Sequence, residues 1–190
     1  MRMAAYARGR GLEVDVASFE AWEPAGRRFD AVTAAQSWHW VDPEVGFRKA
    51  AEVLRPGGRL AIFSHVFEPP EDIATAFAET FRQMVPDSPF NGQSRSARET
   101  HEEGYARIAH AIRETEAFER VELWRDDWTK LYTRSEWLDL LPTTGGLTRL
   151  PADKQATILR AVGAAIDARG GSFTMEYMTL SVTGLRSEHR

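Results

Sequence analysis

The pattern of apolar and polar positions in the first third of the chain predicts one β-α-β unit. An apolar run at 29–35 is followed by a polar and aromatic loop, an amphipathic segment and a second apolar run at 60–63. The first run is typical of a buried strand in a parallel sheet. Asp42 can cap the following helix, and Pro43 can occupy its first position. The Pro-Gly-Gly turn after Arg55 then ends the helix, because Pro cannot continue it and Gly supplies a left-handed turn.

Apolar positions elsewhere predict further helices and strands on both sides of this unit. Helices are expected at 3–8, 73–84, 102–116, 134–141 and 153–168, and strands at 12–16, 118–128 and 173–182. Residues 86–98 are rich in Pro, Ser, Asn and Gly and are expected to form a loop. Because no repeat and no linker divides the chain, we expect a single domain over residues 1–190.

Composition excludes several classes of function. The chain has 190 residues, of which 43% are hydrophobic and 27% charged, as in an ordinary soluble globular protein. Its formal net charge of −4 argues against a nucleic-acid partner, because phosphate contacts need clustered Lys and Arg. No apolar run approaches the roughly 20 residues that span a membrane. There is no cysteine, so disulfides and thiolate zinc sites are excluded and a cytoplasmic location is expected.

One order of motifs is specific to a family. FDAV, then QSWHWVDP, then a helix that ends in VLRPGGRLAIF is similar to the second half of the class I S-adenosylmethionine-dependent methyltransferases. The chain most resembles their type 11 small-molecule branch, which includes trans-aconitate methyltransferase-like proteins. The resemblance implies an α/β fold with a Rossmann-like sheet, an antiparallel strand pair near the C-terminus and helical lid insertions. It also implies methyl transfer from S-adenosylmethionine to a small-molecule acceptor such as a carboxylic acid.

The glycine-rich loop and the acidic ribose ligand of that family do not occur in this sequence. Compared with the family, the chain starts in the helix after the second strand, so we expect a domain truncated at its N-terminus with half of the cofactor site missing. The family strand order is 3-2-1-4-5-7-6. The strand at 12–16 would therefore lack both neighbours and the strand at 29–35 would lack one, which is a pairing liability.

Three explanations of that gap are open. The two strands meet directly, or another chain fills the gap, or the natural start lies upstream. The second explanation gives an alternative function, in which a catalytically inactive methyltransferase-like remnant binds a partner, either in a homodimer or with a strand-donating chain. A dehydrogenase is disfavoured, because its dinucleotide fingerprint would also have to lie upstream.

The resemblance assigns cofactor contacts to two loops at the carboxyl ends of predicted strands, where open α/β sheets bind ligands. Ser18 and Phe19 stand where the family contacts adenine, and the Phe19 N–H can reach a ring nitrogen. Ser18 replaces an acidic residue that is common at this turn. Ala35 and Gln36 stand where the family holds the methionine part. The alternative for Phe19 is a purely structural place in the core.

The acceptor is expected beside the aromatic loop. Trp38 and Trp40 flank His39, a mixture of aromatic and polar side chains that is typical of a small-ligand pocket. His39 is the candidate catalytic residue, because imidazole can donate to a carboxylate or take a proton. Alternatively, both Trp side chains pack under the next helix and His39 caps it. His65 is a further candidate for the acceptor side, with the helices of 102–141 as a lid. No metal site is expected, since no His shows paired spacing with a carboxylate.

Overall fold

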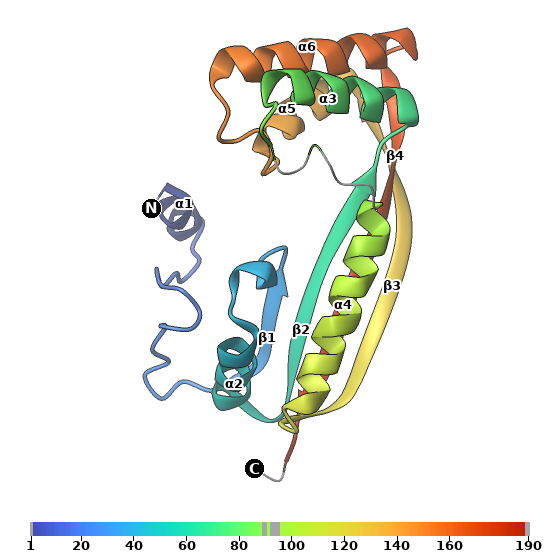
Figure 1. Ribbon diagram of the computed structural model, residues 1–190. Helices are drawn as coiled ribbons and strands as arrows, with labels where there is room; N and C mark the ends of the chain where they lie inside the picture. Colours follow the sequence, from blue (N-terminus) through green and yellow to red (C-terminus); the bar gives the residue numbers. More distant parts are fainter. Residues whose placement is uncertain (1, 89–90, 92–95, 189–190) are drawn as a thin grey trace. The chain divides into compact units, whose positions relative to one another are not determined.

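The computed structural model describes residues 2–88, 91 and 96–188, and within these ranges it contains one mixed sheet of four strands (Figure 1). The strands are β1 (Phe29–Ala35), β2 (Leu54–Glu68), β3 (Phe118–Thr133) and β4 (Ser172–Arg186). The helices are α1 (Arg2–Gly9), α2 (Pro43–Val53), α3 (Glu71–Met84), α4 (Ala97–Glu114), α5 (Arg134–Leu140) and α6 (Ala152–Ala168), with 3₁₀ turns η1 (Trp38–Trp40) and η3 (Leu141–Thr143). None of these helices is both long and apolar enough to cross a membrane.

The strand order is β1-β2-β4-β3. β1 runs parallel to β2, with Val32 opposite Leu60 and Ala35 opposite Phe63. β4 runs antiparallel to both of its neighbours (Figure 1). This order is the 4-5-7-6 end of the order that the family resemblance implies, so the predicted α/β fold with a late antiparallel strand pair is confirmed.

The predicted β-α-β unit is present, and local signals set its boundaries. The Asp42 carboxylate accepts a hydrogen bond from the Val45 N–H at 3.0 Å, and Pro43 is the first residue of α2. Gly57 has φ +74°, which is the left-handed conformation expected at the turn after the helix. β2 starts at Leu54, so the turn lies inside a longer strand than the one predicted at 60–63.

Two predictions around the open edge of this sheet are wrong. Residues 12–16 form no strand, and Leu12 and Val16 are 62% and 63% exposed. Without a neighbouring strand to hydrogen-bond with, these apolar residues do not adopt strand geometry. β1 occurs at the predicted residues, but it is not buried. Val32 is half-buried and Thr33 is exposed, because β1 is the outermost strand and has a neighbour on one side only.

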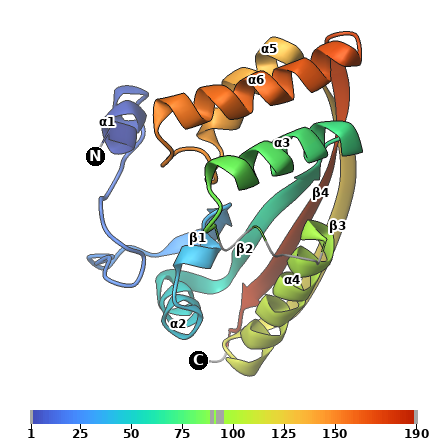
Figure 2. The same ribbon diagram turned by 45° about the horizontal axis from the view of Figure 1, so that its top comes forward.

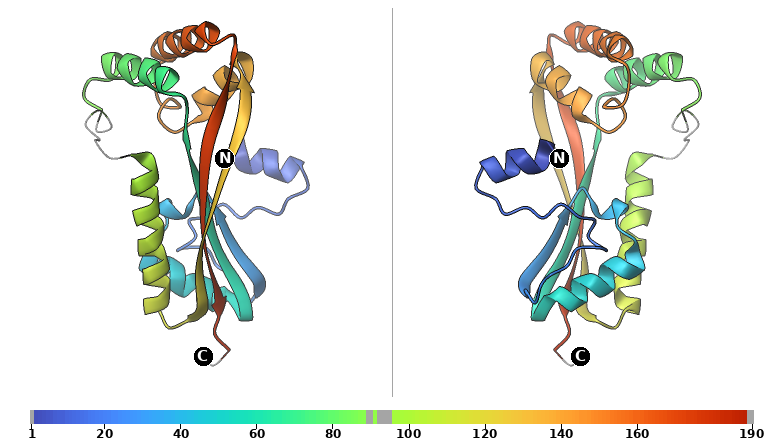
Figure 3. Two further views of the ribbon diagram at one scale, coloured as in Figure 1. Left: turned by 90° about the vertical axis from the view of Figure 1, so that its right-hand side faces the viewer. Right: turned by 90° about the vertical axis from the view of Figure 1, so that its left-hand side faces the viewer.

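The chain divides into two compact units. The first comprises Met1–Ser64, Glu102–Arg125 and Leu180–Arg190. Figure 3 shows α4 along one face of the sheet, and its side chains Tyr105, Ala109 and Ile112 are buried. α4 begins five residues before the helix predicted at 102–116. Within the predicted loop at 86–98, residues 89–90 and 92–95 lie outside the described ranges.

The second unit comprises His65–His101 and Asp126–Thr179. Its α3 and α6 lie side by side (Figure 2), and both were predicted from their apolar stripes. Their core residues include Ile73, Ile158 and Val162, each at most 1% exposed. The predicted helices of this part of the chain are therefore confirmed to within two residues at each end of α5 and α6.

Candidate functional site

The loop that follows β1 starts with an unusual backbone conformation. Gln36 has φ +53°, in the left-handed region that non-glycine residues rarely adopt, and its N–H donates to the Phe63 carbonyl at 3.0 Å. This bond ends β1 and turns the chain into η1. Ala35 and Gln36 are both exposed. A strained residue is kept only where its surroundings fix it, and such residues cluster at ligand sites.

Trp38 is locked under this loop. Its side chain is 6% exposed, and its ring stacks on Phe47 of α2 with a centroid distance of 5.2 Å. Phe19 packs against the same ring at 6.1 Å. A Cβ on Gly46 would lie 2.5 Å from Val41 Cγ1 and 3.1 Å from Trp38 Cζ2, so this seat requires glycine. The importance of Gly46 was not predicted, although a glycine inside an amphipathic helix is a recognisable signal.

The indole N–H of Trp38 is buried and has no hydrogen-bond acceptor among the described residues. A buried donor without a partner destabilises the folded state by about 1–3 kcal/mol. Such groups are rare in folded proteins, and an ordered water is their usual partner where the chain offers none.

Glu20 ties the first candidate loop to the second. Its Oε1 accepts the Asp42 N–H at 2.8 Å, which joins residues 22 positions apart at the start of α2. This backbone hydrogen bond is the main reason that the pKa of Glu20 lies below its usual range. Together with the contact of Phe19 on Trp38, it brings the two cofactor loops predicted from the sequence into one cluster. Glu20 itself was missed, because its partner is distant in the sequence.

The remaining residues of the first loop are less constrained. Ser18 is exposed, and its hydroxyl accepts the Ala21 N–H at 3.3 Å. Within the described ranges the Phe19 N–H donates to no acceptor. The loop therefore keeps one backbone donor unused beside a half-buried aromatic ring.

His39 and Trp40 lie on the surface. Trp40 is 76% exposed, and its ring lies 4.7 Å from the ring of His39. His39 does not cap α2, because Asp42 does. The two Trp side chains thus have different surroundings. Trp38 is buried and supports the loop, whereas Trp40 is exposed and available to a ligand.

His65 belongs to the second unit, on the last third of β2. Its ring lies edge-on to Tyr177 at 5.2 Å and to Trp128 at 6.2 Å. Burial, with a smaller contribution from the nearby His101, lowers the pKa of His65. Its role at the acceptor stays a prediction.

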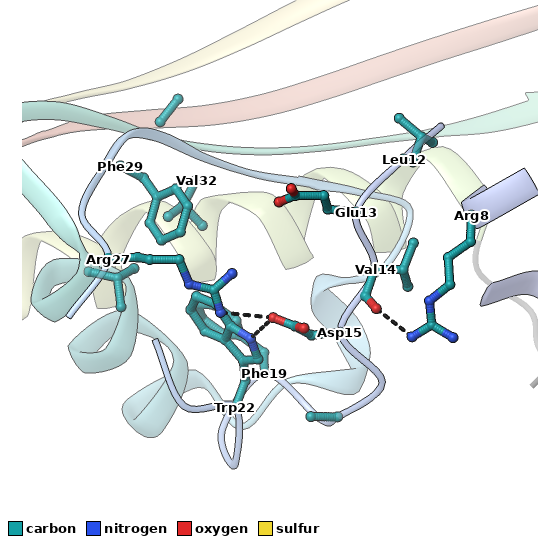
Figure 4. Close-up of a pocket in the computed structure, with 13 residues that line it drawn as sticks. Arg8, Leu12, Glu13, Val14, Asp15, Phe19, Trp22, Arg27, Phe29 and Val32 are labelled. Carbon is teal, nitrogen blue, oxygen red and sulfur yellow. Dashed lines mark hydrogen bonds and ion pairs between the residues drawn. The ribbon is translucent and has the colours of Figure 1, made fainter. Parts of the chain in front are cut away.

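The first unit also contains a pocket of about 830 Å³ (Figure 4). Asp15 is fixed in its wall, where one carboxylate oxygen accepts from Trp22 Nε1 at 2.7 Å and from Arg27 Nη2 at 2.9 Å. The Arg27 guanidinium lies 5.0 Å from the Trp22 ring centre. Of the site residues predicted from the sequence, Phe19 is the one that lines this pocket. Within the described residues, no three His, Asp or Glu side chains gather as a metal site requires.

Comparison with known proteins finds a matching domain family for the first third of the chain. Residues 1–62 match the family model described as a methyltransferase domain. Uncharacterized methyltransferases of Mycobacterium tuberculosis and Mycobacterium bovis are 61% identical over 33 residues, which are 17% of this chain and 14% of each of those proteins. In this match the chain covers about one seventh of the length of the curated relatives.

A solved structure covers most of the chain. The structure of a putative type II methyltransferase from Anaeromyxobacter dehalogenans has a TM-score of 0.57 and 20% identity, and the match covers 92% of this chain and 72% of that one. At this identity the match establishes the fold. Residues 1–62 are therefore similar to a methyltransferase domain, and the chain shares the fold of the Anaeromyxobacter dehalogenans structure.

Proposed function

We propose that the protein transfers a methyl group from S-adenosylmethionine to a small-molecule acceptor. The match of residues 1–62 to the methyltransferase domain family supports this most directly, because that stretch contains both clustered loops. The fold agrees with it, since the loop of residues 36–42 follows β1 at the carboxyl end of the parallel strand pair, and Phe19 of the other loop packs against Trp38 there.

The cluster around the Phe19–Trp38 contact fits the cofactor. The Phe19 N–H is a donor without an acceptor within the described ranges, and it suits a ring nitrogen of the adenine. In this proposal Ser18 and Phe19 hold the adenine, while Ala35 and Gln36 hold the methionine part. The bound cofactor supplies an activated methyl group, so the protein mainly provides position and a dry environment.

His39 and Trp40 are proposed to bind the acceptor. The exposed Trp40 ring offers an apolar surface, and the adjacent imidazole can donate to a carboxylate or take a proton from the acceptor. A small, partly apolar carboxylic acid would use both. Trp38 is proposed to act differently, because its ring face is already occupied by Phe47.

Titration calorimetry with S-adenosylmethionine and S-adenosylhomocysteine tests the cofactor proposal. We expect saturable but weak binding of both compounds, because the glycine-rich loop of the family's cofactor site does not occur in this sequence. Trp38→Phe replaces the indole by a smaller ring and reduces its packing against Phe19 and Phe47, so it should weaken binding several-fold by loosening the support of both loops. Trp124→Phe is the matched control, because Trp124 is 58% exposed on β3 and should have no effect. Absence of heat with both compounds would refute the proposal.

The acceptor assignment has its own test. Radiolabelled methyl transfer is measured to a panel of small di- and tricarboxylic acids, including trans-aconitate. Trp40→Ala should raise the KM for the acceptor at least several-fold more than the KM for the cofactor, with Trp124→Ala as the control. Equal losses for both substrates would contradict a role of Trp40 at the acceptor.

A further inference from the structure

The second unit contains an apolar cavity of about 210 Å³. Its lining residues all belong to this unit, and they come from the end of β2, from α3, α5 and α6, and from η3 and its flanks. Ile73, Leu141 and Val162 in its wall are each at most 4% exposed, so the cavity borders the core of the unit. Because folded proteins leave few voids larger than a water molecule, a space of this size is unusual.

The aromatic part of the wall has a fixed shape. The Trp137 ring, which lines the cavity, is packed by three other rings. The distances between ring centres are 5.5 Å to Phe67, 5.3 Å to Tyr132 and 5.8 Å to Phe173. All three contacts are close to edge-to-face, with interplanar angles of 80°, 64° and 87°. The indole therefore cannot turn into the cavity without losing these contacts.

Polar contacts hold α3 and α6 in place at both ends of the helix pair. Asp72 at the start of α3 and Arg169 directly after α6 form an ion pair at 3.1 Å. At the other end, Lys154 Nζ donates to the Met84 carbonyl at 2.6 Å. Since both helices line the cavity, a shift of either helix into it would disturb both contacts. The cavity thus stays open without help from an occupant.

The lining suits neither water nor a charge. None of the described residues that line the cavity is charged, and Trp137 and Thr144 have the only polar side-chain atoms among them. The Thr144 hydroxyl already donates to the Leu141 carbonyl at 2.7 Å. A buried water needs roughly two to four polar partners, which this lining does not provide. A charged group would lose its hydration and gain no counter-charge.

We propose that this cavity binds a small, uncharged, apolar molecule that consists of one ring or a short alkyl chain. A dry cavity of about 150 Å³ with an apolar lining is large enough to bind benzene. Scaled by volume, the cavity of this protein holds about eight or nine non-hydrogen atoms, as in an alkylbenzene. This inference goes beyond methyl transfer and does not depend on it.

A free molecule fits this lining better than the side chain of a partner protein does. An inserted side chain brings its own backbone N–H and C=O groups with it, and these need hydrogen-bond partners when they are buried. The lining has few partners to offer, because the Thr144 proton is already used. A hydrocarbon has no polar group to satisfy, and burying it in the cavity removes its whole apolar surface from water.

Methyl NMR of the full chain with ethylbenzene tests the proposal. We expect saturable ring-current shifts at the methyl groups of Ile73, Leu141 and Val162, and none at Leu12, which is 62% exposed in the first unit. Benzylammonium has nearly the same shape but carries a charge, and it should bind at least 10-fold more weakly. Equal affinity for both compounds would overturn the proposal, as would the absence of shifts or shifts spread evenly over both units.

Two variants make the result specific. Ala74→Leu fills part of the cavity and should weaken ethylbenzene binding at least 10-fold. Ala78→Leu is the matched control, because Ala78 is exposed on the same helix, and it should bind as the parent does. If Ala74→Leu fails to fold, Phe77→Ala decides, since the wider cavity should favour naphthalene over ethylbenzene at least several-fold more than the parent does. Unchanged affinities in the variant that folds would refute the assignment.

Light scattering without ligand covers the remaining outcome. A monomer is expected. A dimer whose formation shifts the methyl groups of Ile73, Leu141 and Val162 by itself would assign the cavity to a second copy and overturn the proposed ligand. No cofactor is present in these experiments, so their failure is distinguishable from failure of the methyltransferase proposal.

Discussion

Replacing Gly46 by alanine tests whether the seat of Trp38 is as tight as the structure shows. The new Cβ would lie 2.5 Å from Val41 Cγ1 and 3.1 Å from Trp38 Cζ2. The first distance is well inside van der Waals contact, so the Val41 side chain or α2 must move. Movement of α2 would displace Trp38, and with it the support of the candidate cofactor loops.

Two opposing effects set the size of the change. In an open helix, alanine is more favourable than glycine by about 0.8–1.0 kcal/mol. Overpacking a tight site destabilises by about 1–3 kcal/mol. We therefore expect Gly46→Ala to lower the free energy of unfolding by up to ~2 kcal/mol. Gly104 in α4 is the matched control, because a Cβ there would meet only Arg107 Nη2 at 4.0 Å. Gly104→Ala should raise the free energy of unfolding by about 1 kcal/mol.

Urea unfolding followed by tryptophan fluorescence and far-UV circular dichroism measures both variants. Val41→Ala in the same chain provides the space that the new methyl group needs. The double variant should therefore lose less stability than the sum of its two single variants, with a coupling on the order of 1 kcal/mol. If Gly46→Ala stabilises as much as Gly104→Ala does, the argument from the Trp38 seat is refuted.

Three further changes are expected to affect stability. The hydroxyls of Tyr132 and Tyr177 are 2.7 Å apart in a buried pair, so either single Tyr→Phe should cost about 1–3 kcal/mol in urea unfolding and the double variant less than the sum. Additive losses would contradict this. Asp42→Ala removes the cap of α2 and should cost about 1 kcal/mol, whereas an unchanged urea midpoint would speak against it. Hydrogen bonds from the Trp22 indole and, to a smaller extent, from the Arg27 guanidinium lower the pKa of Asp15. Its ionised form thus contributes stability at neutral pH that is lost as pH falls through the folded-state pKa, and Asp15→Asn should flatten the loss of stability below about pH 4. An unchanged acid limb would argue against that contribution.

Signals confined to a few neighbouring residues predicted the fold best. The cap at Asp42, the proline after it and the left-handed glycine at 57 all lie where the sequence indicated. Strand lengths were predicted less well. β3 continues to Thr133 through positions that are mostly exposed and follow no alternation. Its second half is held by pairing with β4, which comes from a segment far along the chain.

The same distinction applies to the candidate site. The sequence indicated the loop after β1 by its mixture of aromatic and polar residues. It could not show which Trp beside His39 is buried, because that depends on the space above Gly46 and on the ring of Phe47. The strand predicted at 12–16 failed for a related reason, since strand geometry depends on a partner that no local pattern reveals.

The position of β4 bears on how the protein is made. β4 is the last of the described strands in the sequence, yet it is an inner strand that alone joins β2 to β3. Its side chains at Met175, Met178 and Val182 are fully buried. While the ribosome has not yet released residues 172–186, β2 and β3 each carry an unpaired edge and an uncovered apolar face. During synthesis the nascent chain is thus prone to aggregation until β4 is released. Chaperones that cover exposed strands would protect it until the sheet is complete.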